Sequence, residues 1–351
     1  MKKMNSIENV DKNFKIETKI DKPDMEFHSA RSAPFRIYGV FHKDGKFRRM
    51  PEEVAKKVSP GVHFLHANTA GGRVRFTTSS PYVAINAKMT GITRMDHFPL
   101  CGSAGFDLYA DGVYVKTFRP PYDMKDGYES IIELGEARMR EIIIHFPLYS
   151  DVCDLFIGLS RDAEILAAPL YRVEKPVVFY GSSVTQGGCA SRPGTCYQGF
   201  LSRWMDFDYI NLGFSGNARG EDEIADYIAS LDMSAFVCDY DYNTPNAEHL
   251  AKTHEKLFMK VRAAHPDLPI ILVTRPKPIY TNGEDLDCFE VIKKTYENAL
   301  ARGDKKVSFI DGRTMFALAG TEGTVDSVHP TDLGFLSMAK RIAENLKAFL
   351  I

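Results

Sequence analysis

The stretch VVFYGSSVTQGG, from Val177 to Gly188, marks the point where the chain changes its pattern. Four apolar residues run directly into a glycine and two serines, as in a buried strand that ends in a polar turn. Downstream, compact apolar runs alternate with segments whose apolar residues recur at helical spacing. Alternation of strand and helix predicts a doubly wound parallel sheet with helices on both faces.

Five apolar runs are expected to be the strands of this sheet. They are Val177 to Tyr180, Tyr209 to Leu212, Ala235 to Tyr240, Ile270 to Thr274 and Val307 to Asp311. The expected helices are Tyr197 to Met205, Glu221 to Ser230, Ala247 to Ala264, Phe289 to Ala301 and Thr331 to Leu350. We therefore predict an α/β domain over residues 171–351, built on a five-stranded parallel sheet.

The first half of the chain has a different rhythm. Its short β-rich segments are separated by turn residues: 36–40, 73–78, 82–88, 105–110, 114–118, 130–133 and 141–145. Helical patterns are nearly absent, apart from a short turn at 51–57. These features predict an all-β, jelly-roll-like sandwich over residues 1–170, joined to the second domain through a linker-like stretch at 169–176.

Composition narrows the classes of partner. The 351 residues have 44% apolar and 26% charged side chains and a net charge of −2, with both signs interspersed. No basic patch of the kind that binds nucleic acid or anionic lipid stands out, so we expect a small or weakly charged ligand. The N-terminus has no apolar stretch of signal-peptide or anchor length, which favours a cytoplasmic protein, although a chain that had lost its signal would look the same.

The six cysteines are scattered without paired spacing. No C-x-x-C motif is present, so neither a zinc knuckle nor a disulfide framework is indicated. Cys189 and Cys196 are close enough along the chain to pair, but free thiols are favoured.

Polar residues follow each predicted strand of the second half. Ligands bind at the carboxyl ends of parallel strands, because the loops open a crevice there. The residues of interest at these positions are Ser182, Ser183, Gly216, Asn243, Arg275, Asp326 and His329. We expect the functional site along this edge.

These residues include the set that acyl transfer needs. A serine hydroxyl becomes a nucleophile when a histidine takes its proton, and a third group must hold the imidazole in one tautomer. We expect His329 to be the base and Asp326 to hold it. The Ser183 and Gly216 backbone N–H groups and the Asn243 side chain are expected to stabilise the oxyanion.

Four blocks resemble those of the SGNH hydrolases, also called GDSL-like esterases. They are GSSVTQG at 181–187, NLGFSGN at 211–217, DYDYNTP at 239–245 and DSVHP at 326–330, in the family's order. The resemblance implies a flavodoxin-like catalytic domain and selects Ser183, not Ser182, as the nucleophile. It also implies an acyl-enzyme mechanism that requires no metal or organic cofactor.

Two departures from the family pattern refine the expected substrate. Ser182 stands where many relatives carry aspartate, and Thr244 follows Asn243 where the pattern has aspartate. Both variants resemble those of carbohydrate esterases that remove acetyl groups. The resemblance therefore implies a short-chain, acetyl-type ester on a small molecule or oligosaccharide as substrate.

The segment Gly105 to Tyr109 reads GFDLY. It is similar to the Gly-x-Asp-Leu-Tyr signature of a β-domain that precedes SGNH catalytic domains in bacterial proteins. We expect this domain to shape the acceptor side of the cleft or to hold a glycan. A role in forming a homo-oligomer stays open as the alternative.

Two rival functions remain. Asp239 and Asp241 follow the third strand with the spacing of aspartate-nucleophile phosphatases that use magnesium, although that motif belongs on the first strand of its domain. A non-catalytic glycan-binding protein is the second rival.

Other candidates are weaker. His63 and His66 are expected to be structural and not metal ligands. For His97 a core or turn position is favoured over the cleft. Arg275 is expected either to line the cleft or to brace a carboxylate.

Overall fold

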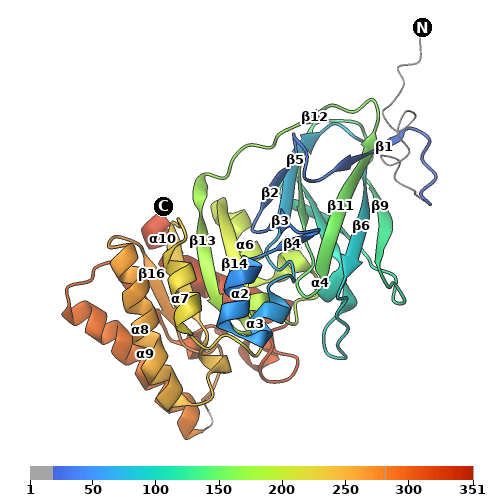
Figure 1. Cartoon of the computed structure of the whole chain (residues 1–351). Helices are drawn as coiled ribbons and strands as arrows, with labels where there is room; N and C mark the ends of the chain where they lie inside the picture. Colours follow the sequence, from blue (N-terminus) through green and yellow to red (C-terminus); the bar gives the residue numbers. More distant parts are fainter. Residues whose placement is uncertain (1–18, 281, 351) are drawn as a thin grey trace.

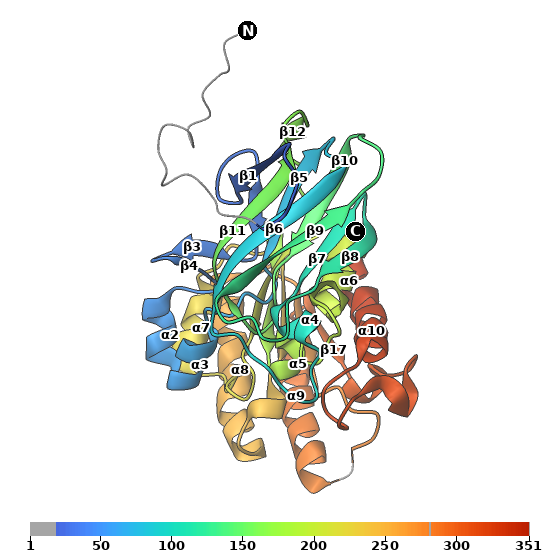
Figure 2. The ribbon, with the colours of Figure 1, turned by 90° about the vertical axis from the view of Figure 1, so that its right-hand side faces the viewer.

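The computed structural model describes residues 19–280 and 282–350 (Figures 1 and 2). Among these residues, two large antiparallel sheets and a two-stranded one come from the first half of the chain, and one parallel sheet comes from the second. In Figure 1 the antiparallel sheets lie at the upper right and the helix-covered parallel sheet at the lower left.

The two antiparallel sheets form a sandwich. The first has the order β1-β11-β6-β9, with bounds Met25–Ser29, Asp151–Ser160, Tyr82–Thr90 and Gly127–Glu133. The second has the order β12-β5-β10-β7-β8, with bounds Ile165–Leu166, Arg73–Thr78, Arg140–His145, Phe106–Ala110 and Val113–Phe118, and β2 (Arg36–Tyr38) also pairs with β5. Ile85 and Leu155 of the first sheet share one apolar core with Phe76, Leu108 and Ile144 of the second. The predicted β-sandwich is confirmed.

The parallel sheet has the order β14-β13-β15-β16-β17. The strands span Phe207–Gly213, Val173–Gly181, Ala235–Asp239, Ile270–Val273 and Val307–Ile310, and each neighbouring pair is parallel. The first strand of the domain therefore lies between the second and the third, which is the flavodoxin-like order. The predicted doubly wound fold is confirmed.

Helices cover both faces of this sheet, because successive strand residues point to opposite sides. Val177 and Phe179 pack on the face covered by α6 (Tyr197–Met205) and α10 (Asp332–Leu350). Val178 and Tyr180 belong to the opposite core. That second face is covered by α7, α8 and α9, with bounds Asp222–Ala229, Ala247–Ala264 and Gly283–Ala301.

Two helices of the first half also pack on the second face of the parallel sheet. They are α2 (Glu52–Val58) and α3 (Pro60–Leu65), and they follow the hairpin of β3 (Phe41–Lys43) and β4 (Lys46–Arg48). Their buried residues Ala55, Val58, Val62 and Leu65 join the core beneath α7 and α8. The sequence indicated only a turn at 51–57, because a local pattern does not show on which sheet a helix packs.

Other elements also differ from the prediction. The strand β11, the longest of the antiparallel strands, was not predicted, because Asp151 and Asp154 interrupt its apolar pattern and its register shifts between Val152 and Asp154. The stretch expected to be a linker is partly strand, since β13 begins at Val173. The helix α9 begins at Gly283, earlier than expected.

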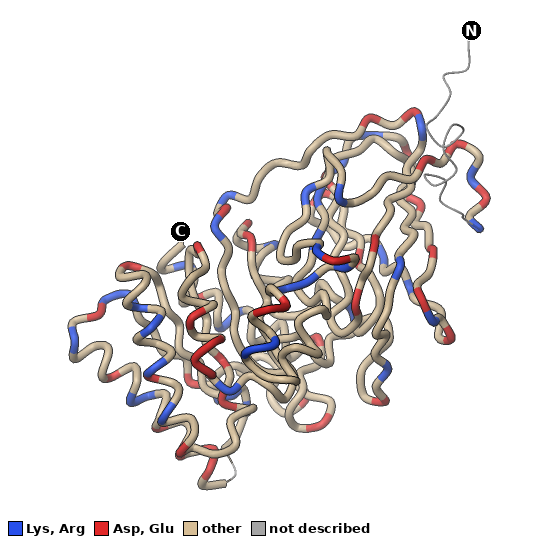
Figure 3. The backbone as a smooth tube through the Cα atoms, viewed as in Figure 1, with Lys and Arg blue, Asp and Glu red and all other residues tan. Residues whose placement is uncertain are grey.

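Positions of basic and acidic residues are interspersed along the chain in both halves of the molecule (Figure 3). No helix within the described residues is long and apolar enough to cross a membrane.

Candidate active site

The predicted site residues occupy the loops at the carboxyl ends of the parallel strands. Ser183 begins α5 (Ser183–Gln186) directly after β13, and Gly216 lies in the loop after β14. Asn243 ends η3 (Asp241–Asn243) after β15. Asp326 and His329 lie between η5 (Gly320–Gly323) and α10.

The two neighbouring serines have different environments. Ser182 is fully buried and caps α5, because its hydroxyl accepts a hydrogen bond from the Val184 N–H at 3.2 Å. Ser183 is 8% exposed, and its Oγ lies 3.0 Å from His329 Nε2. The second serine is therefore the one in contact with a histidine.

Asp326 fixes the other side of the imidazole. His329 Nδ1 lies 2.7 Å from Asp326 Oδ2, while Asp326 Oδ1 accepts from the backbone N–H groups of His329 and Val328 at 2.7 and 3.0 Å. Partial burial by itself raises the pKa of Asp326. The hydrogen bonds from His329 and the backbone have the larger combined effect in the opposite direction, so the pKa lies below its ordinary value. The carboxylate thus stays ionised and keeps Nε2 directed at Ser183.

Three donor groups have the properties of oxyanion donors. The N–H groups of Ser183 and Gly216 have no acceptor among the described residues. Gly216 has a φ of +70°, a left-handed conformation that favours glycine, and a Cβ there would face open space. The Asn243 amide oxygen accepts from the Ala218 N–H at 3.3 Å, which leaves its NH₂ group to donate elsewhere.

Arg275 braces carboxylates beneath Asn243. Its Nε and backbone N–H each lie 3.1 Å from Asp241 Oδ2, and its Nη1 lies 2.8 Å from Asp285 Oδ1. Asp241 is 1% exposed, and Asp239 is 2% exposed. Burial raises the pKa of both buried carboxyls, most strongly for Asp239. Neither is an open nucleophile, and the structure favours the bracing role of Arg275 over cleft lining.

Two residues of the first half reach the site. The ring of His97 packs edge-on against His329 with centroids 5.4 Å apart, and the Tyr149 hydroxyl donates to the Ser183 carbonyl oxygen at 3.2 Å. His97 lies in a turn, as was favoured, but this turn also brings its ring to the site, which was the less favoured alternative. Sequence offered little signal, because the contact joins a loop of one domain to a loop of the other.

The Gly-x-Asp-Leu-Tyr segment holds a loop of the catalytic half. Asp107, fully buried, accepts from Gly194 N at 2.8 Å and from Arg192 Nη1 at 2.9 Å, and Arg192 also donates to the Tyr109 hydroxyl at 2.6 Å. Gly194 has no room for a side chain, since a Cβ would lie 2.6 Å from that hydroxyl. The motif thus fixes the segment between α5 and α6.

The same loop is tied to the beginning of α10. Asp332 accepts from Ser191 N at 2.8 Å and from Thr195 Oγ1 at 2.7 Å. Asp332 lies three residues after His329. The β-domain is therefore linked by hydrogen bonds to the segment that carries His329.

The six cysteines are free. Burial raises the pKa of the Cys189 thiol to about 12, and the nearby Asp326 carboxylate adds to the shift. His63 and His66 stack on each other with ring centroids 5.3 Å apart. The two rings bond to Glu52, Arg48 and a backbone carbonyl, in keeping with a structural role.

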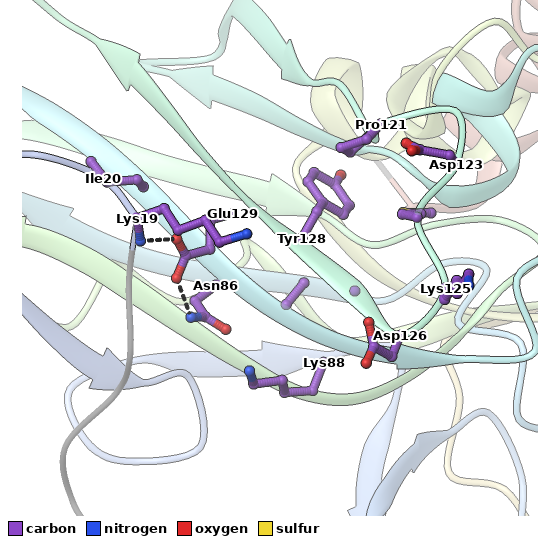
Figure 4. Close-up of a pocket in the computed structure, with 13 residues that line it drawn as sticks. Lys19, Ile20, Asn86, Lys88, Pro121, Asp123, Lys125, Asp126, Tyr128 and Glu129 are labelled. Carbon is purple, nitrogen blue, oxygen red and sulfur yellow. Dashed lines mark hydrogen bonds between the residues drawn. The ribbon is translucent and has the colours of Figure 1, made fainter.

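A cavity of about 1030 Å³ lies away from this site, on the outer face of the four-stranded sheet (Figure 4). It is lined by Asn86 and Lys88 of β6, Tyr128 and Glu129 of β9, and Lys19. The Lys19 N–H and the Asn86 amide both donate to the Glu129 carboxylate. None of the predicted site residues lines this cavity.

A flavodoxin-like sheet with serine, histidine and aspartate joined at its carboxyl edge is the arrangement of α/β serine hydrolases. Residues 174–347 match the GDSL-like Lipase/Acylhydrolase family, and residues 25–165 match the N-terminal domain of SGNH-hydrolase-type esterases, named GxDLY. The second half of the chain thus belongs to the GDSL-like lipase/acylhydrolase family, and the first half is its GxDLY-type partner domain. The protein is an esterase by class.

Solved structures share this two-domain architecture. A protein described as a GDSL-like lipase from Bacteroides ovatus is 29% identical, with a TM-score of 0.81 over 92% of this chain and 98% of its own. The salicylyl-acyltransferase SsfX3 of a tetracycline biosynthetic pathway is 19% identical, with a TM-score of 0.78 over 93% and 98%. A family two carbohydrate esterase from Clostridium thermocellum, solved with cellohexaose, is 14% identical, with a TM-score of 0.63 over 90% and 98%. No curated protein sequence matches the chain.

Proposed function

We propose that the protein hydrolyses short-chain esters, acetyl esters of carbohydrates in particular, through a Ser183–His329–Asp326 triad. The observation that carries this proposal is the continuous chain of contacts from Ser183 Oγ to His329 Nε2 at 3.0 Å and from His329 Nδ1 to Asp326 at 2.7 Å.

The first half-reaction forms an acyl-enzyme. Ser183 Oγ attacks the ester carbonyl carbon while its proton passes to His329 Nε2. The carbonyl oxygen becomes an anion, which accepts hydrogen bonds from Ser183 N, Gly216 N and the Asn243 amide. The bond to the sugar oxygen then breaks, and His329 returns the proton to the departing alcohol.

The second half-reaction releases the acid. A water molecule gives a proton to His329 and attacks the acyl carbon, and Ser183 leaves with that proton. Asp326 stays ionised throughout and stabilises the imidazolium form. The residues present supply each proton transfer and each oxyanion donor in this scheme.

The acetyl and carbohydrate preferences have separate support. Ser182 and Thr244 are the variants that resemble carbohydrate esterases, and a neighbour of the same fold is a carbohydrate esterase solved with an oligosaccharide. We further propose that the β-domain shapes the acceptor side of the cleft, where His97 adjoins His329.

The two rival functions have less support. A phosphatase would need Asp239 or Asp241 to face substrate, but both are buried and Asp241 is held by Arg275. A glycan-binding protein without catalysis gives no reason for the contact between Ser183 and His329.

Acetate release from a panel of acetylated xylo-, manno- and cello-oligosaccharides, with p-nitrophenyl acetate as reference, tests the proposal. We expect hydrolysis by the wild type and a loss of at least about 10³-fold in kcat for Ser183→Ala. Ser182→Ala, which removes only the cap of α5, is the matched control and should retain most activity. Unchanged hydrolysis by Ser183→Ala would exclude the mechanism. If activity were instead lost both on adding a chelator and in Asp239→Asn, the result would favour the phosphatase.

A further inference from the structure

Three metal-binding side chains converge beside the triad. His97, Cys189 and His329 each offer one ligand atom, and these atoms lie within 4.8 Å of one another. His97 comes from the segment between β6 and α4 (Leu100–Ala104) of the β-domain, Cys189 follows α5, and His329 precedes α10. Three segments that are distant along the chain therefore place two imidazoles and a thiol around one point.

Both histidines are oriented as metal-ligating histidines usually are. Such residues donate their second ring nitrogen to a carboxylate or carbonyl, which fixes the tautomer and directs the other nitrogen to the metal. His329 Nδ1 lies 2.7 Å from the Asp326 carboxylate, and His97 Nδ1 lies 3.3 Å from that of Asp96. In His97 this arrangement leaves Nε2 free to coordinate, and in His329 it leaves Nε2 directed at Ser183 Oγ, whose place a metal ion would take.

Cys189 has no other polar role. Its sulfur makes no hydrogen bond within the described residues, although its side chain is only 4% exposed. A thiolate together with two imidazoles is the type of ligand set that Zn²⁺ binds with its usual tetrahedral geometry.

The distances require only a small adjustment. Zinc–nitrogen bonds of about 2.0 Å and a zinc–sulfur bond of about 2.3 Å place the ligand atoms roughly 3.3–3.6 Å apart. Closing from 4.8 Å requires about 1 Å of movement. The His97 side chain is 36% exposed and can make this movement by a change in its side-chain torsions.

We propose that His97, Cys189 and His329 form a zinc-binding site that reversibly inhibits the enzyme. Binding replaces the proton of the Cys189 thiol, which is released to solvent, with a sulfur–zinc bond. The zinc ion also takes the lone pair of His329 Nε2. Ser183 then has no base to accept its proton, so acylation stops while zinc is bound.

This inference rests on the proposed role of His329 for the inhibition, but not for the binding itself. Because His97 belongs to the β-domain, the ion would join the two halves of the protein beside Ser183 and exclude an ester from it.

The test uses untagged, full-length protein treated with a chelator and then dialysed. We expect ZnCl₂ to inhibit p-nitrophenyl acetate hydrolysis and a chelator to restore it fully. Cys189→Ala should keep the metal-free activity within about twofold. Both Cys189→Ala and His97→Ala should raise the half-inhibitory zinc concentration, measured against each variant's own metal-free activity, by at least about tenfold. His63→Ala and Cys101→Ser, which remove the same residue types elsewhere, are the matched controls and should leave zinc inhibition unchanged.

Cobalt binding gives a readout that does not depend on activity. Co²⁺ should produce a thiolate-to-cobalt absorption band in the wild type and in Ser183→Ala, but not in Cys189→Ala. His97→Ala, at a part-exposed side chain, keeps the test valid if Cys189→Ala does not fold. Absence of the band in the wild type, or zinc inhibition of both ligand variants at the half-inhibitory concentration of the wild type, would overturn the proposal. A band in a protein that hydrolyses no ester would instead reject only the proposed function.

Discussion

At the scale of single residues, the site depends on what each neighbour leaves free. The Ser182 hydroxyl accepts a hydrogen bond that caps α5, and the Asn243 amide oxygen accepts one from the Ala218 N–H. The Ser183 hydroxyl and the Asn243 NH₂ group therefore stay available for chemistry. The two neighbouring serines, and the two polar atoms of the Asn243 amide, thus differ in role because they differ in hydrogen-bond partners.

The role of Asn243 gives a prediction at this scale. Asn243→Ala should lower kcat by about 10²–10³-fold with little change in KM, because the oxyanion exists only in the transition state. Steady-state kinetics on p-nitrophenyl acetate measure both constants. Asn243→Asp keeps an oxygen for the Ala218 N–H but loses the donor, so it should be impaired at least as strongly. If both variants kept kcat within twofold, Asn243 would not be an oxyanion donor.

At the scale of elements, the loops carry the chemistry while strands and helices hold them. The turn that bears Asn243 is held in place by Arg275, which follows β16 and binds Asp241 and also Asp285 in α9. The helices α8 and α9 are themselves joined by His254, whose Nδ1 lies 2.9 Å from Thr295 Oγ1. Buried polar contacts of this kind set the spacing of the helices that cover the sheet.

His254 predicts a dependence of stability on pH. Burial lowers its pKa from 6.5 to about 4, so the unfolded chain binds a proton in a range where the folded protein does not. The stabilising effect of neutral His254 is present above pH 6.5 and is lost as the pH falls toward 4, by about 2 kcal/mol at pH 5. Urea unfolding at pH 7.5 and pH 5 measures it.

His254→Gln, which can still bond to Thr295 and does not titrate, is the comparison. Its free energy of unfolding should fall by about 2 kcal/mol less than that of the wild type between the two pH values. Equal slopes for the two proteins would show that His254 is not held neutral by burial.

At the scale of the whole molecule, the two halves are interlocked. The helices α2 and α3 complete one face of the parallel sheet, and buried Arg49 donates to the carbonyl oxygens of Leu65 at 2.7 Å and Gly213 at 2.6 Å. Asp107 holds the loop of Arg192 and Gly194 from the other side. We therefore expect the chain to unfold as one cooperative unit.

Asp107→Asn tests this coupling. The variant loses the charge partner of Arg192, and the free energy of unfolding should fall by about 1–3 kcal/mol. Fluorescence of Trp204 in α6 and far-ultraviolet circular dichroism should report a single transition at the same urea concentration. Asp111→Asn, on the same hairpin but exposed, should change the free energy by less than about 0.5 kcal/mol. Two separate transitions in the wild type would contradict the interlocked fold.

Sequence reasoning reached the fold class because apolar runs and helical spacing are local signals. It placed β13 to β17 in order, and from the family blocks it placed Ser183, Asp326 and His329 in contact range, as the distances of 3.0 and 2.7 Å show. The elements that were not predicted from the sequence depend on packing partners that are distant along the chain. The strand β11 is defined by its two neighbours, and α2 and α3 by the sheet of the other domain.

The same limit applies to the site. His97 and Tyr149 come from the β-domain, and neither carries a local pattern that indicates contact with His329 or Ser183. The hydrogen bonds from Arg192 and Gly194 to Asp107 were likewise not predicted, and the sequence showed Asp107 only as part of a family signature. Contacts between the two domains become visible only in the three-dimensional structure, because the spacing of residues along the sequence does not indicate which loops of different domains meet.

The central claim is that Ser183 is activated by His329, and covalent labelling tests it most directly. A fluorophosphonate probe, followed by peptide mass spectrometry, should give one adduct on Ser183 in the wild type and in Ser182→Ala. The adduct should be absent in Ser183→Ala and should form at least about 10²-fold more slowly in His329→Ala. An adduct on another residue, or none in a protein that hydrolyses esters, would contradict the account.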